Sequence, residues 1–399
     1  MISLFVFTSC NDSTPTQPID DPDLETQGDF DEFNEVVLDF AYESLLFLNN
    51  REEENLLFSP LSIESALYMT MNGTDGKTLE EFRTALRIGS FYSNGINTHY
   101  KTLLEKLDPK DNRTSLSSNN TVFFDDQWVD LDENFINVIK DNFEAEATDA
   151  DFSDPSTVDL INNWAEENTE GKIKEVIKEI KQDEVLFLIN ALYFISDWEI
   201  GFDPDYTFPN TFTKSDGSEV TAPFMVSDDI RNYVITEDYS AVDLMLKGQD
   251  YSMTFILPSE DPKAFIGQFN LSSFKTWINE LYQGLQNDRL QLDLPKFEMA
   301  NKFLLNDMLI DMGMETAFDS ANLDRMGQFY GGQTYISRVI HDAFLKIDEK
   351  GIEGAAVTTV GVGVESLPPS INLNRPFIFV VRHVETNTPI FIGKMGDPS

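Results

Sequence analysis

Residues 349–369 read Glu-Lys-Gly-Ile-Glu-Gly-Ala-Ala-Val-Thr-Thr-Val-Gly-Val-Gly-Val-Glu-Ser-Leu-Pro-Pro. Every second position is apolar or small: Ile352, Gly354, Ala356, Thr358, Val360, Val362 and Val364. Because successive side chains of a strand point to opposite faces, this set would form one face that packs on a core. Pro368 and Pro369 end the pattern, since proline cannot donate to a β-ladder. On the residues alone, an ordinary central strand explains this stretch.

The rest of the chain predicts a globular α+β protein. It has 399 residues, 41% of them hydrophobic, which is enough for a sizeable core. Helical and strand-like patterns mix without a clean β-α-β repeat, which favours one large α+β domain. Helices are expected from about residue 31, from Pro60, and at residues 135–143, 161–180 and 301–312. Strands are expected at residues 122–124, 185–194, 244–246, 253–257, 290–294, 377–381 and 389–392. The continuous apolar run of residues 185–194 is typical of a strand buried on both faces.

The charge balance excludes one class of partner. The chain carries 28 Lys+Arg against 70 Asp+Glu, a formal net charge of -42. Such a surface repels phosphate backbones and anionic headgroups, so we expect no nucleic-acid partner. The acidic surface serves solubility or attracts basic partners.

The sequence offers little catalytic chemistry. The three histidines, His99, His341 and His383, lie in no metal-binding spacing, and no GxSxG motif is present. The single cysteine, Cys10, excludes an intrachain disulfide. We therefore expect no metal, no cofactor and no enzymatic activity.

The N-terminus suggests an anchor. Residues 1–10 read Met-Ile-Ser-Leu-Phe-Val-Phe-Thr-Ser-Cys and resemble the end of a bacterial lipoprotein signal. Cys10 would be the lipidated first mature residue, followed by a flexible acidic tether over residues 11–30. The apolar region is short, and no Lys or Arg precedes Arg51, which departs from a complete signal. The alternative is a disordered tail with a free or buried thiol. No apolar run reaches ~18 residues, so we expect membrane attachment only through such a lipid.

Short motifs follow one another along the chain. They are Asn55-Leu-Leu-Phe-Ser-Pro-Leu-Ser-Ile63, Asn162-Asn-Trp164, Thr169-Glu-Gly-Lys-Ile173, Asn190-Ala-Leu-Tyr-Phe194, Trp198, Phe202-Asp-Pro204, Leu294-Pro-Lys-Phe297, Asn374-Arg-Pro-Phe377 and Phe391-Ile-Gly393. In this order, and together with residues 349–369, they resemble the serpin family of protease inhibitors. Each motif is weak alone, but the series is specific and covers about residues 31–398. The resemblance implies a serpin fold over residues 31–399: a large central sheet, smaller sheets, surrounding helices and an exposed reactive-centre loop at about 350–369.

The resemblance also implies a mechanism. In this family a protease cuts the loop, which then inserts into the large sheet while the protease stays covalently attached. The implied hinge comprises Glu349, Lys350, Gly351, Ile352, Glu353, Gly354, Ala355 and Ala356. Ile352 replaces the family's usual small hydroxyl residue and Gly354 an alanine, and neither blocks insertion. The implied protein is a monomeric suicide substrate, extracellular or in the cell envelope.

The cut site follows from the family's spacing. The residue before the scissile bond usually lies sixteen positions beyond the hinge glutamate, which gives the bond Glu365–Ser366. That bond suits an acid-specific serine protease, with cysteine proteases as a second class of target. A register slip by one would give Val364–Glu365 and an elastase-like target.

Two clusters acquire roles from the resemblance. Ser59, Ser62, Asn190 and His341 match the "shutter", a buried polar cluster under the sheet. Trp198, Lys296 and Glu349 match the "breach", where the loop enters, with an implied Lys296–Glu349 ion pair. From the residues alone, Ser59 also fits a helix cap, His341 a core histidine and Trp198 plain core packing.

Two other functions compete with inhibition. The first is a non-inhibitory serpin that binds or carries a ligand and is cut without trapping; small residues at positions 354–356 argue against it, because they favour fast insertion. The second is a structural lipoprotein of the cell envelope, which leaves the alternation in residues 352–364 unexplained.

Overall fold

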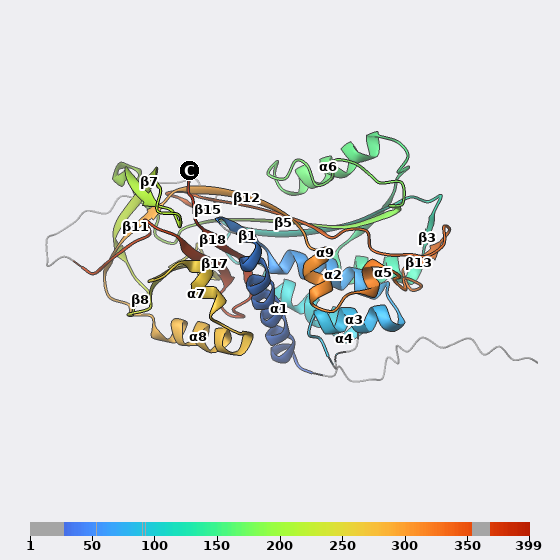
Figure 1. Cartoon of the computed structure of the whole chain (residues 1–399), viewed down its shortest axis with the longest axis horizontal. Helices are drawn as coiled ribbons and strands as arrows, with labels where there is room; N and C mark the ends of the chain where they lie inside the picture. Colours follow the sequence, from blue (N-terminus) through green and yellow to red (C-terminus); the bar gives the residue numbers. More distant parts are fainter. Residues whose placement is uncertain (1–27, 53, 90, 92, 353–367) are drawn as a thin grey trace, which may run out of the picture.

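The computed structural model describes residues 28–399 apart from 53, 90, 92 and 353–367. Its longest sheet, which we call the main sheet, has the strand order β12-β14-β15-β5-β2-β4. These strands are β12 Phe297–Leu304, β14 Ile340–Ile347, β15 Gly351–Ile352, β5 Leu186–Asp197, β2 Thr114–Phe124 and β4 Glu146–Asp149. Figure 1 shows α6 (Ser156–Asn168) on one face of the main sheet and α2 (Pro60–Asn72) with further helices on the other.

The remaining strands form three smaller groups. One sheet contains β1 Leu56–Phe58, β18 Pro389–Met395, β17 Phe377–His383, β10 Tyr251–Pro258, β9 Tyr239–Met245 and β8 Tyr233–Ile235. A second contains β16 Ser370–Asn372, β11 Leu290–Pro295, β7 Glu219–Ile230 and β6 Thr207–Thr213, and a pair is formed by β13 Gly327–Phe329 and β3 Val129–Leu131. The other helices are α1 Phe30–Arg51, α3 Gly76–Ala85, α4 Ser93–Lys106, α5 Glu133–Phe143, α7 Pro262–Gly267, α8 Leu271–Gly284 and α9 Asn306–Asp311, with short 3₁₀ turns at Pro204–Tyr206 and Thr316–Phe318.

Helix α2 starts where the sequence predicts. The Ser59 side chain accepts a hydrogen bond from the Ser62 backbone N–H at 3.2 Å, and Pro60 occupies the first turn. Ser59 and Pro60 thus fix the helix start. Most of α2 is buried, because the helix lies between the main sheet and α1, α3 and α5.

The helix predicted over residues 161–180 is too long. Helix α6 ends at Asn168, and the chain turns away at Glu170 and Gly171, which both have positive φ values. The side chain of Asn162 then bonds the backbone of the departing chain: its Oδ1 accepts from the N–H of Val176 at 2.8 Å. Residues 172–184, which we call the crossing segment, therefore run across the main sheet without helical structure.

Two further predictions need correction. Residues 301–304, predicted as helical, belong to β12, in which Phe297, Met299 and Phe303 are buried at alternate positions and pair with β14. Only Asn306–Asp311 is helical there. Residues 186–194 do form a strand, but buried and half-buried positions alternate in its first part. Phe187 and Ile189 pack with Ile161 of α6 and Ile177 of the crossing segment, whereas the half-buried Leu186, Leu188 and Asn190 border a cavity on the α2 side. No helix among the described residues is long and apolar enough to cross a membrane.

Candidate functional site: a hinge seated in the main sheet

The first hinge residues already lie inside the main sheet. Ile352 pairs with Ile347 of β14 on one side and with Ser196 of β5 on the other. Its side chain is 1% exposed. Gly351 has a φ of +155°, and a Cβ at this position would overlap the carbonyl oxygen of Ser196, so only glycine fits. The resemblance places insertion of the loop after cleavage, yet the hinge residues Gly351 and Ile352 already lie in the sheet of the uncut chain.

Glu349 anchors the chain just before this strand. Its carboxylate lies 2.7 Å from Lys296 Nζ and accepts a hydrogen bond from Thr207 Oγ1 at 2.8 Å. Its carbonyl accepts from the N–H of Phe202 at 2.8 Å. Burial favours a higher pKa of Glu349, but the bonds from Lys296 and Thr207 outweigh it and hold the pKa below the usual value. The predicted Lys296–Glu349 ion pair is therefore present.

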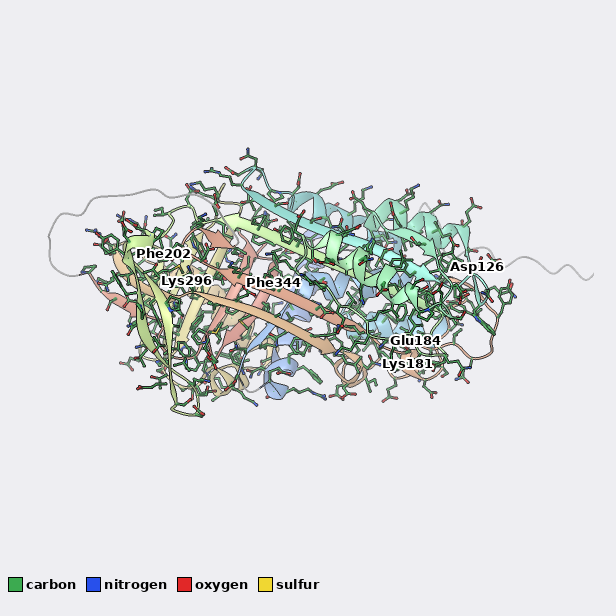
Figure 2. The ribbon with its side chains drawn as sticks, turned by 90° about the horizontal axis from the view of Figure 1, so that it is seen from above. Asp126, Lys181, Glu184, Phe202, Lys296 and Phe344 are labelled. Carbon is green, nitrogen blue, oxygen red and sulfur yellow. The ribbon has the colours of Figure 1, made fainter. Side chains whose placement is uncertain are left out.

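Trp198 both packs and holds the hinge. It is 3% exposed, and its ring lies 6.3 Å from that of Phe202. Its indole N–H donates to the carbonyl of Asp348 at 2.9 Å, and its backbone N–H donates to the carbonyl of Lys350 at 2.6 Å. Figure 2 shows Phe202 and Lys296 at the same end of the molecule, on the left of the picture. We call this end of the main sheet the upper end and the opposite end the lower end.

The second predicted cluster lies lower in the sheet. The backbone N–H of Ser59 donates to His341 Nε2 at 2.9 Å, so this nitrogen carries no proton. Burial lowers the pKa of His341 to about 3, and the ring is neutral. Ser62 completes this group through its bond to Ser59.

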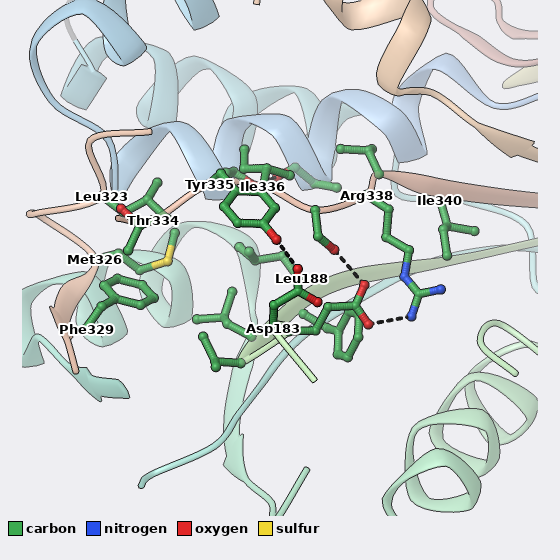
Figure 3. Close-up of a pocket in the computed structure, with 18 of the residues that line it drawn as sticks. Asp183, Leu188, Leu323, Met326, Phe329, Thr334, Tyr335, Ile336, Arg338 and Ile340 are labelled. Atoms are coloured by element: carbon green, nitrogen blue, oxygen red, sulfur yellow. Dashed lines mark hydrogen bonds and ion pairs between the residues drawn. The ribbon is translucent and has the colours of Figure 1, made fainter. Parts of the chain in front are cut away.

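Asn190 belongs to a neighbouring set of contacts. Its amide donates to Asn120 Oδ1 and to Ser118 Oγ, both at 2.9 Å, and Asn120 also accepts from Ser65. Its own Oδ1 is buried with no partner among the described residues. Asn120 and Ser65 were not predicted, because no motif marks them. Asn190, Ser62 and His341 all border one cavity of about 310 Å³ (Figure 3).

Below Ile352 the two central strands are not joined. Among the described residues, no backbone pair links β5 directly to β14, and β15 is their shared neighbour only at its two residues. We call this interval, between residues 186–195 of β5 and 340–346 of β14, the slot. The crossing segment covers its outer side, where Lys172 lies 5.3 Å from the ring of Phe344. Unpaired strand edges are a template for a further strand.

Several predicted residues lie outside the described part of the chain. They are Cys10, Glu353, Gly354, Ala355, Ala356, Val364, Glu365 and Ser366.

Comparison with known proteins places this geometry in one family. The family described as "Serpin (serine protease inhibitor)" matches residues 35–398. Serpin A3-3 of Bos taurus is 33% identical over 370 residues, covering 90% of this chain and 88% of the relative. The native-state crystal structure of the thermophilic serpin tengpin has a TM-score of 0.84 at 31% identity, covering 94% of this chain and 96% of tengpin. Thyroxine-binding globulin in complex with thyroxine has a TM-score of 0.80 at 25% identity, covering 92% and 100%. The predicted α+β serpin fold is confirmed, and the chain belongs to the serpin family.

Proposed function

We propose that this protein inhibits a serine protease as a suicide substrate. The observation that carries the proposal is the position of β15: the hinge residues Gly351 and Ile352 lie in the main sheet, at the upper end of a slot whose two edges are unpaired in the described residues. A segment that continued from Ile352 would gain backbone hydrogen bonds on both sides. Its apolar face, predicted from the alternation, would be buried.

The pairing of Ile352 also fixes the expected register of insertion. If both ladders continue without a bulge, Thr358 arrives between Asn190 and His341. The Thr358 hydroxyl would then reach the unpaired Oδ1 of Asn190. Val360 arrives between Leu188 and Val339, in apolar surroundings. The continued register thus places the polar Thr358 beside polar side chains and the apolar Val360 beside apolar ones. This match supports insertion of the segment.

We further propose that the protease cuts Glu365–Ser366, with Val364–Glu365 as the alternative, and that residues 353–356 complete the hinge. The acidic surface would favour a basic protease. The remaining proposals from the sequence are a lipid at Cys10, a tether over residues 11–30, and a location outside the cell or in its envelope.

The test is covalent trapping. Mixed with elastase-like and acid-specific serine proteases, the protein is expected to form a band on a denaturing gel with the summed mass of inhibitor and protease, because an acyl-enzyme that cannot deacylate survives denaturation. The same protease with its active-site serine blocked provides the control and should give no such band. Mass spectrometry of the released C-terminal peptide distinguishes a start at Ser366 from a start at Glu365.

A carrier function is the second candidate. The similarity to thyroxine-binding globulin favours it, because that structure holds thyroxine. If every protease that cuts the loop turns over freely and no summed band forms, inhibition is wrong and the carrier function gains support.

A further inference from the structure

A buried ion pair bridges the two sides at the lower end of the slot. This end of the molecule, where Figure 2 labels Glu184, is the one far from Lys296. Glu184 precedes β5, while Ser337 and Arg338 precede β14. The Glu184 carboxylate accepts from Ser337 Oγ at 2.6 Å and from Arg338 Nη2 at 2.8 Å. Arg338 also donates to the carbonyl of Glu179 in the crossing segment at 2.7 Å. We call Glu184, Ser337 and Arg338 the clamp; in Figure 3 the dashed line that ends on Arg338 marks its bond to Glu184.

The surroundings of the clamp make these bonds strong. The side chain of Glu184 is 1% exposed and that of Arg338 14% exposed, and the guanidinium lies 5.5 Å from the ring of Phe187. Charge-assisted hydrogen bonds shielded from water are stronger than neutral ones in solvent. The pair Arg51–Asp307, by contrast, is 48% and 71% exposed, and pairs of that kind contribute little.

The clamp stands where only the last part of the loop would enter. If the register of Ile352 continues, residues 361–364 pass between residues 184–187 on one side and 335–338 on the other. Residues 354–360 would enter above that point, where the described strand edges are unpaired. The clamp therefore bridges the two sides just below the slot, while the slot itself has unpaired edges in the described residues.

We propose that the clamp is a gate that sets the rate at which insertion can be completed. This inference rests on the loop insertion proposed above. Opening the gate requires the Glu184–Ser337 and Glu184–Arg338 bonds to break or rearrange before residues 361–364 can lie between the strands.

The test uses two labelled synthetic peptides, with the sequences of residues 354–364 and 354–359, added to the uncut protein and followed on native gels. The variants are Ser337→Ala, which removes one bridging bond, and the double change Glu184→Gln with Arg338→Gln, which leaves no unpaired charge. The matched control is Arg51→Gln with Asp307→Asn, an exposed pair elsewhere. We expect both clamp variants to take up the long peptide about tenfold faster than the wild type and the control. Uptake of the short peptide should not change, because it ends above the clamp.

Three results would overturn the gate. Unchanged uptake of the long peptide in the clamp variants would show that the clamp does not limit insertion. Equal acceleration of both peptides would show general loosening of the sheet. If the wild type takes up neither peptide and gains no stability when its loop is cut, the insertion mechanism is wrong, and so is the gate. If the wild type does take up peptide, insertion is possible, and unchanged rates in the clamp variants would contradict the gate alone.

Discussion

His341 shows how one buried side chain ties the sheet to α2. Its Nε2 accepts the Ser59 backbone N–H, so a proton on that nitrogen would break the bond and place a charge where burial is nearly complete. The unfolded chain has no such restriction and takes up the proton near pH 6.5. The folded state binds this proton only near pH 3. Between those values the unfolded state binds more protons, so this residue makes the protein less stable as the pH falls.

Replacing His341 by glutamine should reduce the loss of stability in acid. The glutamine carbonyl oxygen can accept the Ser59 N–H and does not titrate. Between pH 7 and pH 5 the free energy of unfolding of the wild type should fall by about 2 kcal/mol more than that of His341→Gln. Urea unfolding of both proteins at the two pH values measures this difference in the free energy of unfolding. The carboxylates are the same in the wild type and the variant, so their contribution cancels in the comparison. Identical pH dependence would show that His341 is not held neutral.

The residues of the site differ in how far the sequence could predict them. Lys296 and Glu349 each lie in a motif of the family, so the resemblance alone is enough to pair them. Glu184 and Arg338 lie 154 positions apart and in no motif, and the charge excess of the chain gave Arg338 many acidic partners to choose from. Only the fold brings those two together.

At the scale of elements, the proposed insertion depends on β15. It has two residues, yet it is paired on both sides, and Ile352 fills a buried position between β5 and β14. If the loop inserts as proposed, Gly351 and Ile352 set the register that later residues would follow. Two residues show no period of their own in the sequence, which is why their place in the sheet of the uncut chain could not be predicted.

If the protein inhibits as proposed, changing Ile352 to glutamate should make it a substrate instead. A carboxylate at a position 1% exposed would be buried without a partner, which costs several kcal/mol and withdraws β15 from the sheet. Insertion would then be slower than deacylation, so the protease would be released before the loop could trap it. We expect the amount of inhibitor consumed per trapped protease to rise about tenfold or more. Ile352→Val, which stays apolar, is the matched control. Equal consumption by the two variants would contradict a role for β15 as the seed of insertion.

The longer elements were predictable where local signals agreed with the packing. Ser59 and Pro60 gave the start of α2 correctly, because a cap acts within one turn. The prediction for residues 301–304 is wrong because their buried positions alternate with polar ones whose partners lie on β14, and no local signal reports that pairing. The crossing segment lost its predicted helix to the side-chain bonds of Asn162, which again depend on a contact made only after folding.

For the whole molecule, the positions of Ile352 and Ser370 limit how far the proposed insertion could go in an uncut chain. Thirteen residues from Ile352 to Val364 would extend about 40 Å down the slot at ~3.3 Å each. Ser370, however, pairs with Gln291 of β11, and β11 ends at Pro295, next to Lys296 at the upper end. The five residues 365–369 span at most about 18 Å. They cannot return from the lower end, so, if the inserted arrangement is the more stable one as proposed, the intact protein would be held away from it until the loop is cut.

Cutting the loop between about Val360 and Glu365 should therefore raise the melting temperature. After a cut at Val364–Glu365 or Glu365–Ser366, insertion of Val360, Val362 and Val364 would bury apolar surface worth roughly 5–9 kcal/mol in all, and the new strand adds hydrogen bonds on both sides; an earlier cut would give a smaller gain. For a chain of this size we expect a rise on the order of 10 °C or more. The C-terminal fragment should stay bound, because β17 and β18 pair with β10 and β1 inside another sheet.

Calorimetry of cut and intact protein measures the shift in melting temperature. The cut variant Ala356→Pro, in which a donor is removed from the middle of the new strand, should lose most of that shift. Equal melting temperatures for cut and intact wild type would mean that the loop does not insert.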